Sequence, residues 1–144
     1  MKVSDIMTKP AIHISPEETV EVAARTLTHY NIGILPVCGS DGKVCGLVTD
    51  RDLVIRCMAA GKAAAKTTVR QVMTNRITSV QPQMEAGAAA QLMGQQQVRR
   101  LPVVENGKLC GMVTLGDLAK RQESSQDAAA ALTDITHNVS GDIG

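Results

Sequence analysis

The sequence repeats itself, and this internal repeat constrains the fold more than any other feature. Leu35-Pro-Val37 recurs as Leu101-Pro-Val103, at an offset of 66 (101 − 35). Gly46-Leu-Val-Thr-Asp-Arg-Asp52 recurs as Gly111-Met-Val-Thr-Leu-Gly-Asp117, at an offset of 65 (111 − 46). The residue lost between the two offsets falls where a loop is expected, and loops tolerate such deletions. Two copies of one structural unit are therefore predicted.

Hydrophobic periodicity predicts the same order of elements in both copies, a short helical start followed by β-α-β-β-α. The turn between the last two strands is Asp41-Gly42 in one copy and Asn106-Gly107 in the other, and both are hairpin signals. The helical starts are predicted at 3–7 and 69–73, the first strands at 12–14 and 77–80, the hairpin strands at 34–38, 44–48, 101–104 and 109–113, and the closing helices at 52–58 and 117–121.

The first long helix is predicted to begin at Ser15-Pro16, because serine is a good N-cap and proline suits the first helical turn. Apolar residues from Val20 to Leu27 follow at helical spacing. We place the first repeat at 1–61, a linker at 62–68, the second repeat at 69–122 and a C-terminal tail at 123–144. The tail is predicted to be partly helical and then disordered.

The fold class predicted is α/β of the α+β type, with two β-α-β-β-α repeats packed about a pseudo-two-fold axis. The net charge is only +1, which gives no field that would attract nucleic acid or a membrane surface. The chain has one Tyr and no Phe or Trp, so it lacks the aromatic faces on which bases stack. Its four cysteines and three histidines have no zinc spacing, and we expect no metal site. An acid follows closely on the start, where a signal peptide would be apolar, which favours a cytoplasmic location.

The repeated set of motifs resembles a tandem pair of CBS domains, also called a Bateman module. The shared pattern is Met-Thr, Pro, Leu-Pro-Val and Gly-x-Val-Thr-x-x-Asp, in that order and twice over, across residues 3–121. The resemblance implies a regulatory binding module rather than an enzyme, with no required cofactor. It implies an adenosine-containing regulatory ligand, such as AMP, ADP, ATP or S-adenosylmethionine, in clefts between the repeats. It also implies a homodimer that reports to an effector protein, whose identity the sequence does not give.

The motif Thr-x-x-Asp has two interpretations, and the sequence leaves both open. A threonine hydroxyl can donate to a ligand oxygen, and a carboxylate can accept from the two hydroxyls of a ribose. The family resemblance favours this interpretation for Asp52 and Asp117. Alternatively, each threonine and aspartate form a capping box that only stabilises the start of a helix.

The resemblance implies a preferred cleft at the second motif. Arg99 and Arg100 precede the second Leu-Pro pair, where the first repeat has Gly33 and Ile34, and a guanidinium is well suited to phosphate. The alternative is that both are solvated surface arginines. The predicted residues of this cleft are Thr8, Pro10, Ala11, Ile12, Ile32, Gly33, Arg99, Arg100, Thr114, Gly116 and Asp117.

A second cleft is implied at the first motif, and it lacks the two arginines. Its predicted residues are Ile34, Thr49, Arg51, Asp52, Thr74, Arg76 and Ile77. Ile12, Ile34 and Ile77 can sandwich an adenine or can simply pack in the core. Arg51 lies between two acids and can pair with either.

Two other classes of function compete with ligand sensing. The repeat can serve only as a ligand-independent dimerisation or assembly module. An enzyme is disfavoured because the sequence has no phosphate-binding Gly-x-x-x-x-Gly-Lys loop, no Gly-x-Ser-x-Gly and no His-Glu-x-x-His. No catalytic residue is predicted.

Overall fold

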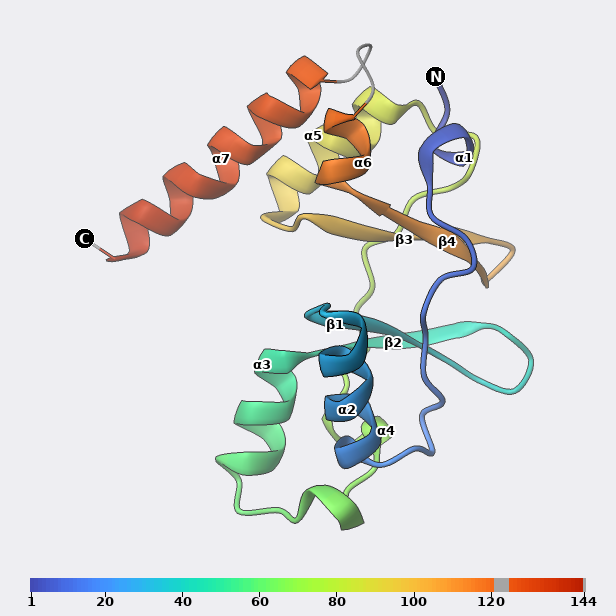
Figure 1. Ribbon diagram of the computed structural model, residues 1–144, viewed down its shortest axis with the longest axis vertical. Helices are drawn as coiled ribbons and strands as arrows, with labels where there is room; N and C mark the ends of the chain where they lie inside the picture. The colour runs from blue at the N-terminus through green and yellow to red at the C-terminus, as the bar shows by residue number, and fades with distance from the viewer. Residues whose placement is uncertain (121–124, 144) are drawn as a thin grey trace. The chain divides into compact units, whose positions relative to one another are not determined.

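The computed structural model describes residues 1–120 and 125–143, and the chain divides into two compact units. Unit 1 comprises Met1–Ala11, Thr78–Asn106 and Cys110–Gly144, and unit 2 comprises Ile12–Ile77 and Gly107–Leu109. Each unit has a long helix, a β-hairpin and a short closing helix (Figure 1). The predicted fold class, a repeated mixture of helices and small sheets, is confirmed. No helix among the described residues is long and apolar enough to span a membrane.

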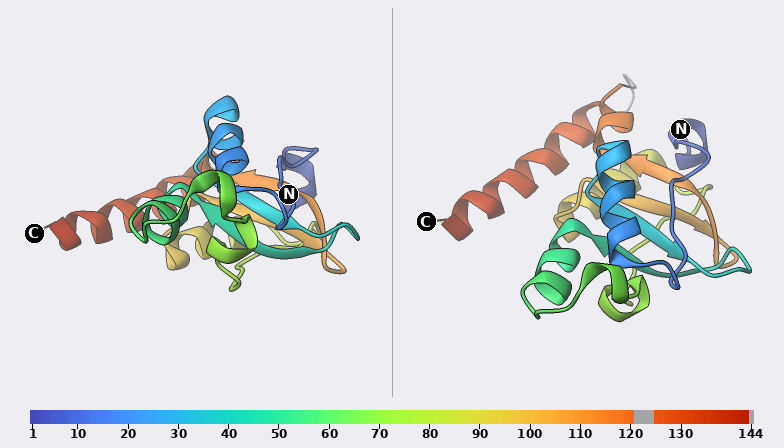
Figure 2. Two further views of the ribbon diagram at one scale, coloured as in Figure 1. Left: turned by 90° about the horizontal axis from the view of Figure 1, so that it is seen from below. Right: turned by 60° about the horizontal axis from the view of Figure 1, so that its bottom comes forward.

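Unit 2 holds the hairpin of the first repeat. Its elements are α2 (Val20–Tyr30), β1 (Ile34–Cys38), β2 (Val44–Thr49), α3 (Asp50–Leu53), a π-helical turn η1 (Val54–Met58), a 3-10 turn η2 (Ala64–Lys66) and α4 (Val69–Val72). The strands are antiparallel, with Ile34 opposite Thr49, and β2 runs directly into α3 (Figure 2). Buried side chains of α2, both strands and α4 form one apolar core.

Unit 1 holds the hairpin of the second repeat except for Gly107–Leu109, which belong to unit 2. Its elements are α1 (Val3–Ile6), α5 (Ala86–Gln96), β3 (Arg100–Glu105), β4 (Lys108–Thr114), α6 (Leu115–Ala119) and α7 (Ser125–Ile143). The two strands are hydrogen-bonded neighbours, and α7 lies along α5 and α6 (Figure 1). Buried residues of α1, α5, the hairpin, α6 and α7 form a second apolar core.

Each repeat contributes its leading segment to the unit that holds the other repeat's hairpin. Thr8, which ends the chain's first Met-Thr motif, pairs with Met112 of the second repeat, and Thr74 pairs with Leu47 of the first. The backbones of the paired segments lie so close together that each hairpin motif needs a glycine at this point. A Cβ on Gly46 would lie 2.9 Å from the backbone oxygen of Thr74, and a Cβ on Gly111 would lie 2.8 Å from that of Thr8. Only glycine fits at either position without moving backbone.

The first long helix begins later than the sequence predicted. It starts at Val20, with Thr19 as N-cap, whereas the prediction was Ser15-Pro16. The reason is competition for backbone groups. The Pro16 carbonyl accepts from the N–H of Arg70, and the Val20 N–H donates to Thr67, so the hydrogen bond that would extend the helix to Pro16 is not made. Ser15 instead closes a turn by accepting from the N–H of Glu17.

Two further sets of predictions, the first strands and the closing helices, need correction. The strands expected at 12–14 and 77–80 are reduced to single parallel bridges, Ile14 to Val37 and Val80 to Val103. A proline, which has no N–H, follows two residues after each bridge and limits its extension.

The closing helices start at Asp50 and Leu115, two residues before the predicted aspartates, because the motif threonine is the N-cap. Residue 121, the predicted end of the second, lies outside the described residues.

The C-terminal segment forms a longer helix than predicted. Helix α7 runs from Ser125 to Ile143, where a short helix followed by disorder was expected. Alanine is the strongest helix former, and Ala128, Ala131 and Ile135 are buried at helical spacing. Packing of this face on α5 and α6 supplies the stability that an isolated helix lacks.

Candidate functional site

Both Thr-x-x-Asp motifs form capping boxes at the start of a short helix. The Thr114 N–H donates to Asp117 Oδ2 at 2.9 Å, and the Asp117 N–H donates to Thr114 Oγ1 at 3.0 Å. Thr49 and Asp52 make the same pair of bonds in unit 2, at 3.0 and 3.1 Å. The capping interpretation is therefore correct for both motifs. It leaves room for ligand contact only where a carboxylate oxygen stays available.

A pocket of about 560 Å³ lies beside the second motif, within unit 1. Arg99, Arg100, Thr114 and Gly116 were predicted for the preferred cleft, and all four line this pocket. The Leu115 N–H donates to the Arg99 carbonyl at 2.8 Å, which fixes the entry of β3 against the start of α6. The remaining lining residues are Leu115, Ala119, Ala128, Ala129 and Leu132.

The charge of this pocket is positive. Within the described part of the chain, neither Arg99 nor Arg100 has a carboxylate partner in an ion pair. Arg99 is exposed and Arg100 is half-buried. The rest of the lining is mainly aliphatic. Two unpaired guanidinium groups beside an apolar wall suit a ligand that has an anionic group and an apolar face.

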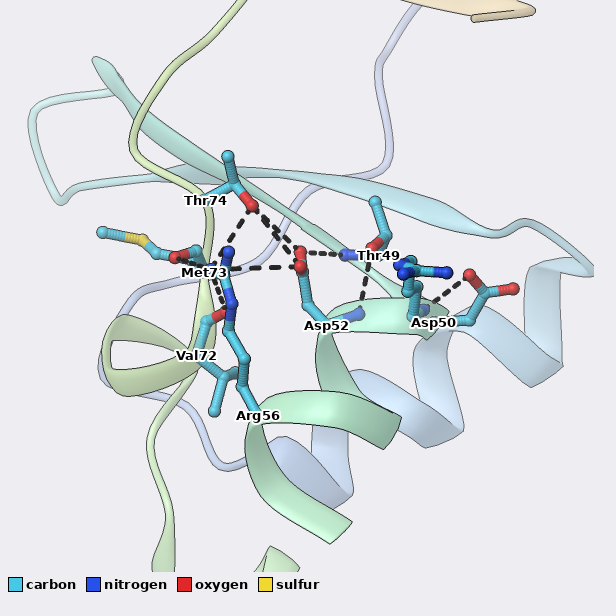
Figure 3. A network of polar contacts seen from close by, with 8 residues as sticks. Thr49, Asp50, Asp52, Arg56, Val72, Met73 and Thr74 are labelled. Carbon is cyan, nitrogen blue, oxygen red and sulfur yellow. Dashed lines mark hydrogen bonds and ion pairs between the residues drawn. The ribbon is translucent and has the colours of Figure 1, made fainter. Parts of the chain in front are cut away.

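The first motif has different surroundings, because its aspartate is enclosed in a polar network (Figure 3). Asp52 is 8% exposed. Beyond its cap, its carboxylate accepts from the Thr74 hydroxyl at 3.4 Å and lies 3.9 Å from the Arg56 guanidinium. The same guanidinium donates to the carbonyls of Val72 and Met73, at 3.1 and 2.9 Å. Through these contacts, Asp52 and Arg56 connect α3 and η1 to the end of α4 and to the two residues that follow it.

The structure places the residues predicted for the second cleft in one unit but joins only some of them. Thr49, Asp52 and Thr74 are linked by hydrogen bonds, and Ile34 pairs with Thr49 across the hairpin. The exposed Arg51 makes no ion pair with a described residue, although its N–H donates to Asp50. Arg76 is exposed, Ile77 is half-buried, and both lie in the same unit beyond Thr74.

The residues predicted for the preferred cleft are divided between the two units. Thr8, Pro10, Ala11 and Asp117 belong to unit 1, as does the pocket, although none of the four lines it. Three others, Ile12, Ile32 and Gly33, belong to unit 2. Ile12 and Ile32 pack against the core of unit 2, as the core-packing alternative predicted for Ile12.

The sequence analysis missed Arg56, which belongs to the Asp52 network, and the α7 residues that line the pocket of unit 1. Arg56 lies four residues after Asp52, which is the usual spacing of an ion pair along a helix, and this signal was available. The three pocket residues of α7, Ala128, Ala129 and Leu132, were also missed. The apolar spacing 128, 131, 132 and 135 predicts an amphipathic helix, but it does not say which surface that helix covers.

Neither Cys38 nor a metal-binding cluster of the described residues offers an alternative site. All four cysteines are free, and burial, with Cys45 and Asp41 nearby, raises the pKa of the Cys38 thiol to about 11. A thiol with so high a pKa is a poor nucleophile at neutral pH. Across the described residues, no three His, Cys, Asp or Glu side chains lie close enough together to hold a metal ion.

Comparisons with known proteins agree with this architecture. Residues 3–58 and 69–124 match the model of the CBS domain. The CBS domain-containing protein YhcV of Bacillus subtilis (strain 168) is 42% identical over 135 residues, which cover 94% of this chain and 95% of that protein.

Solved structures give the same picture. The crystal structure of Hypoxic Response Protein I with two coordinated zinc ions has a TM-score of 0.77 and 32% identity, over 84% of this chain and 98% of that one. The CBS domain pair of protein MJ0100 was solved in complex with 5′-methylthioadenosine and S-adenosyl-L-methionine. It has a TM-score of 0.71 and 26% identity, over 83% of this chain and 94% of that one. This chain, with two matched repeats and the fold of a CBS pair, belongs to the CBS domain family.

Proposed function

We propose that this protein is a regulatory module that binds an adenosine-containing ligand at the pocket of unit 1. The ligand is S-adenosylmethionine or an adenine nucleotide, each of which carries an anionic group. The observation that carries the proposal is the gathering of Arg99, Arg100, Thr114 and Gly116 around one pocket of about 560 Å³. Pockets of this size hold small organic ligands.

The chemistry of the pocket fits such a ligand. The guanidinium groups of Arg99 and Arg100 attract a phosphate or a carboxylate. Asp117 adjoins the lining residue Gly116, and its Oδ1 has no hydrogen-bond partner among the residues described, which leaves it available to a ribose hydroxyl. The aliphatic lining takes the place of an aromatic platform for the base. The adenosyl ligands of the MJ0100 CBS pair support this choice of ligand class.

The module acts by binding rather than by catalysis. The residues that line the pocket include two arginines and a threonine but no histidine or cysteine, and the one acid placed beside the ligand, Asp117, is held in its helix cap. We infer that ligand binding changes the packing of the chain or of a homodimer and that an effector protein responds to the change. Such a change in packing requires that the ligand bind one packing state of the protein more tightly than the other.

Calorimetric titration with S-adenosylmethionine, 5′-methylthioadenosine, AMP, ADP and ATP tests the proposal. At least one of these ligands is expected to bind, and Asp117→Ala should weaken it about tenfold, the loss of one charge-assisted hydrogen bond. Asp41→Ala, which removes an exposed turn acid of unit 2, is the matched control and should bind normally. The proposal is wrong if a folded wild-type chain binds none of the five at millimolar concentration.

A second candidate function, ligand-independent assembly, is favoured by an apolar surface on unit 2. Tyr30, Val54, Ile55 and Met58 are large apolar side chains that are 46–73% exposed. Two of them, Val54 and Met58, line a groove of about 630 Å³ between α2 and η1. Exposed apolar groups in one patch mark interaction surfaces. This candidate predicts a dimer by light scattering that Val54→Asp dissociates, with no effect of any adenosyl ligand on stability.

A further inference from the structure

Helix α7 lies outside the two matched repeats, yet three of its residues line the pocket of unit 1. The repeats match residues 3–58 and 69–124, and α7 begins at Ser125. Its residues Ala128, Ala129 and Leu132 line the pocket together with Arg99 and Arg100. The cationic groups therefore come from a repeat, whereas part of the apolar wall comes from the added helix.

The apolar wall is accessible to a ligand. Leu132 is 39% exposed, and Ala129 is exposed beside it. A large aliphatic side chain that lines a pocket and remains exposed has apolar surface left to bury. A ligand held by Arg99 and Arg100 can bury that surface only while α7 is in place.

The contact that holds α7 is close and made by small residues. A Cβ added to Gly87 would lie 3.1 Å from Asp127 Oδ2, and a Cβ added to Gly94 would lie 3.1 Å from Asp134 Oδ2. The buried residues on the described α7 side are Ala128, Ala131 and Ile135. Alanine and glycine bury little apolar area, so a ligand that covers the exposed Leu132 adds to the apolar area that the docked helix buries.

The first repeat lacks the features that seat this helix. Glu21 and Thr28 occupy the positions of Gly87 and Gly94 at the offset of 66 (87 − 21 and 94 − 28). A glutamate in place of Gly87 would meet the carboxylate of Asp127, with a charge of the same sign. The glycines thus make the second repeat specific for α7.

We propose that α7 is the ligand-coupled wall of the unit 1 pocket: Leu132 selects ligands with an apolar face next to their anionic group, and ligand binding and α7 docking stabilise each other. The coupling is reciprocal by linkage, because a ligand that contacts Leu132 binds the docked form better than the undocked form. This inference rests on the proposed function, since it concerns the same pocket.

Two variants of the full chain test the coupling, with the five adenosyl probes and calorimetry as above. Gly94→Leu introduces a side chain where α7 approaches and should weaken binding about tenfold without touching the pocket lining. Gln95→Leu, at an exposed position of α5, is its control and should bind normally. Leu132→Ala keeps α7 docked and should weaken binding several-fold, whereas its neighbour Thr133→Ala, outside the lining, should not.

Amide hydrogen exchange supplies a readout that is independent of affinity. In the wild type, the bound probe should slow the exchange of amides from residue 128 to residue 135, and Gly94→Leu should abolish this protection. If a probe binds but neither variant weakens it and α7 exchanges at the same rate with and without it, the coupling is wrong and the proposed function stands. If no probe binds the wild type, both proposals fall.

Discussion

The aspartates of the two motifs have the same backbone setting and different surroundings. Asp52 is buried, caps its helix and also meets Thr74 and Arg56. Asp117 caps its helix in the same way but is only half-buried, and it has no further partner among the residues described. Thr-x-x-Asp is thus a helix cap in both repeats. Its capacity for a ligand depends on the residues that surround the carboxylate.

The residues around each motif extend the difference to the pockets. Unit 1 presents Arg99 and Arg100 where unit 2 has Gly33 and Ile34. The groove of unit 2 contains one acid, Asp50, and one base, Lys62, so its lining carries no net positive charge. An anionic ligand is attracted by the first lining and gains little from the second. The repeat has therefore diverged by charge while its backbone stayed the same.

The largest expected effect concerns what the two copies share. Gly46→Val and Gly111→Val should each lower the free energy of unfolding by about 3 kcal/mol, because the new Cβ would meet a backbone oxygen within 3 Å. Gly116→Ala is the control, since its Cβ would lie 3.6 Å from the nearest atom. Urea unfolding followed by circular dichroism measures the three. Equal midpoints for Gly46→Val and Gly116→Ala would show that the close approach is not required.

A smaller effect separates the two aspartates. Asp52→Ala should cost about 2–3 kcal/mol, because it removes a buried carboxylate with charge-assisted hydrogen bonds. Asp117→Ala should cost about 1 kcal/mol, the value of a helix cap. The same urea experiment measures both. Thr74→Val should cost about 0.5–1 kcal/mol and Thr8→Val close to nothing, since only Thr74 bonds to the aspartate of its unit. Equal costs for the two aspartates would contradict the comparison.

A last expected effect is a pH dependence confined to the first repeat. Burial raises the pKa of Cys38 from 9.0 to about 11, and the second repeat has Val104 at the matching position. The unfolded chain loses this proton first, so the stabilising contribution is complete below pH 9 and is lost as the pH rises toward 11. Urea unfolding at pH 8 and pH 10.5 should show a larger loss in the wild type than in Cys38→Val. An identical loss in both would exclude Cys38 as its source.

Much of the fold could be predicted from the sequence because the repeat fixed the alignment of the two halves. The strand Ile34–Cys38 and the helix Ala86–Gln96 follow from local periodicity and turn chemistry alone. The start of α2 could not be predicted, because it depends on a hydrogen bond that the Thr67 carbonyl accepts and one that the Arg70 N–H donates, about 50 residues away along the chain. The exchange of leading segments is likewise a long-range choice that local patterns do not contain.

The lining of the unit 1 pocket could be predicted in part. Arg99, Arg100, Thr114 and Gly116 lie in or next to the repeated motifs, so sequence position was sufficient to bring them together, and their role in binding stays a prediction. Leu132 was out of reach, because its role depends on where α7 docks, and docking depends on Gly87 and Gly94 of another helix. The network around Asp52 was also out of reach, since Thr74 reaches it by the exchange of segments between the repeats.

The central claim is that the second repeat holds the ligand site because of Arg99 and Arg100. The most direct test is calorimetric titration of the double variant Arg99→Gly, Arg100→Ile, which gives the second repeat the residues of the first, beside Asp52→Ala and the wild type. The account predicts that the double variant weakens the best adenosyl ligand at least tenfold, about 1.4 kcal/mol, while folded Asp52→Ala binds as the wild type does. Undiminished binding by the double variant, with loss of binding in Asp52→Ala, would place the site at the first motif and contradict the account.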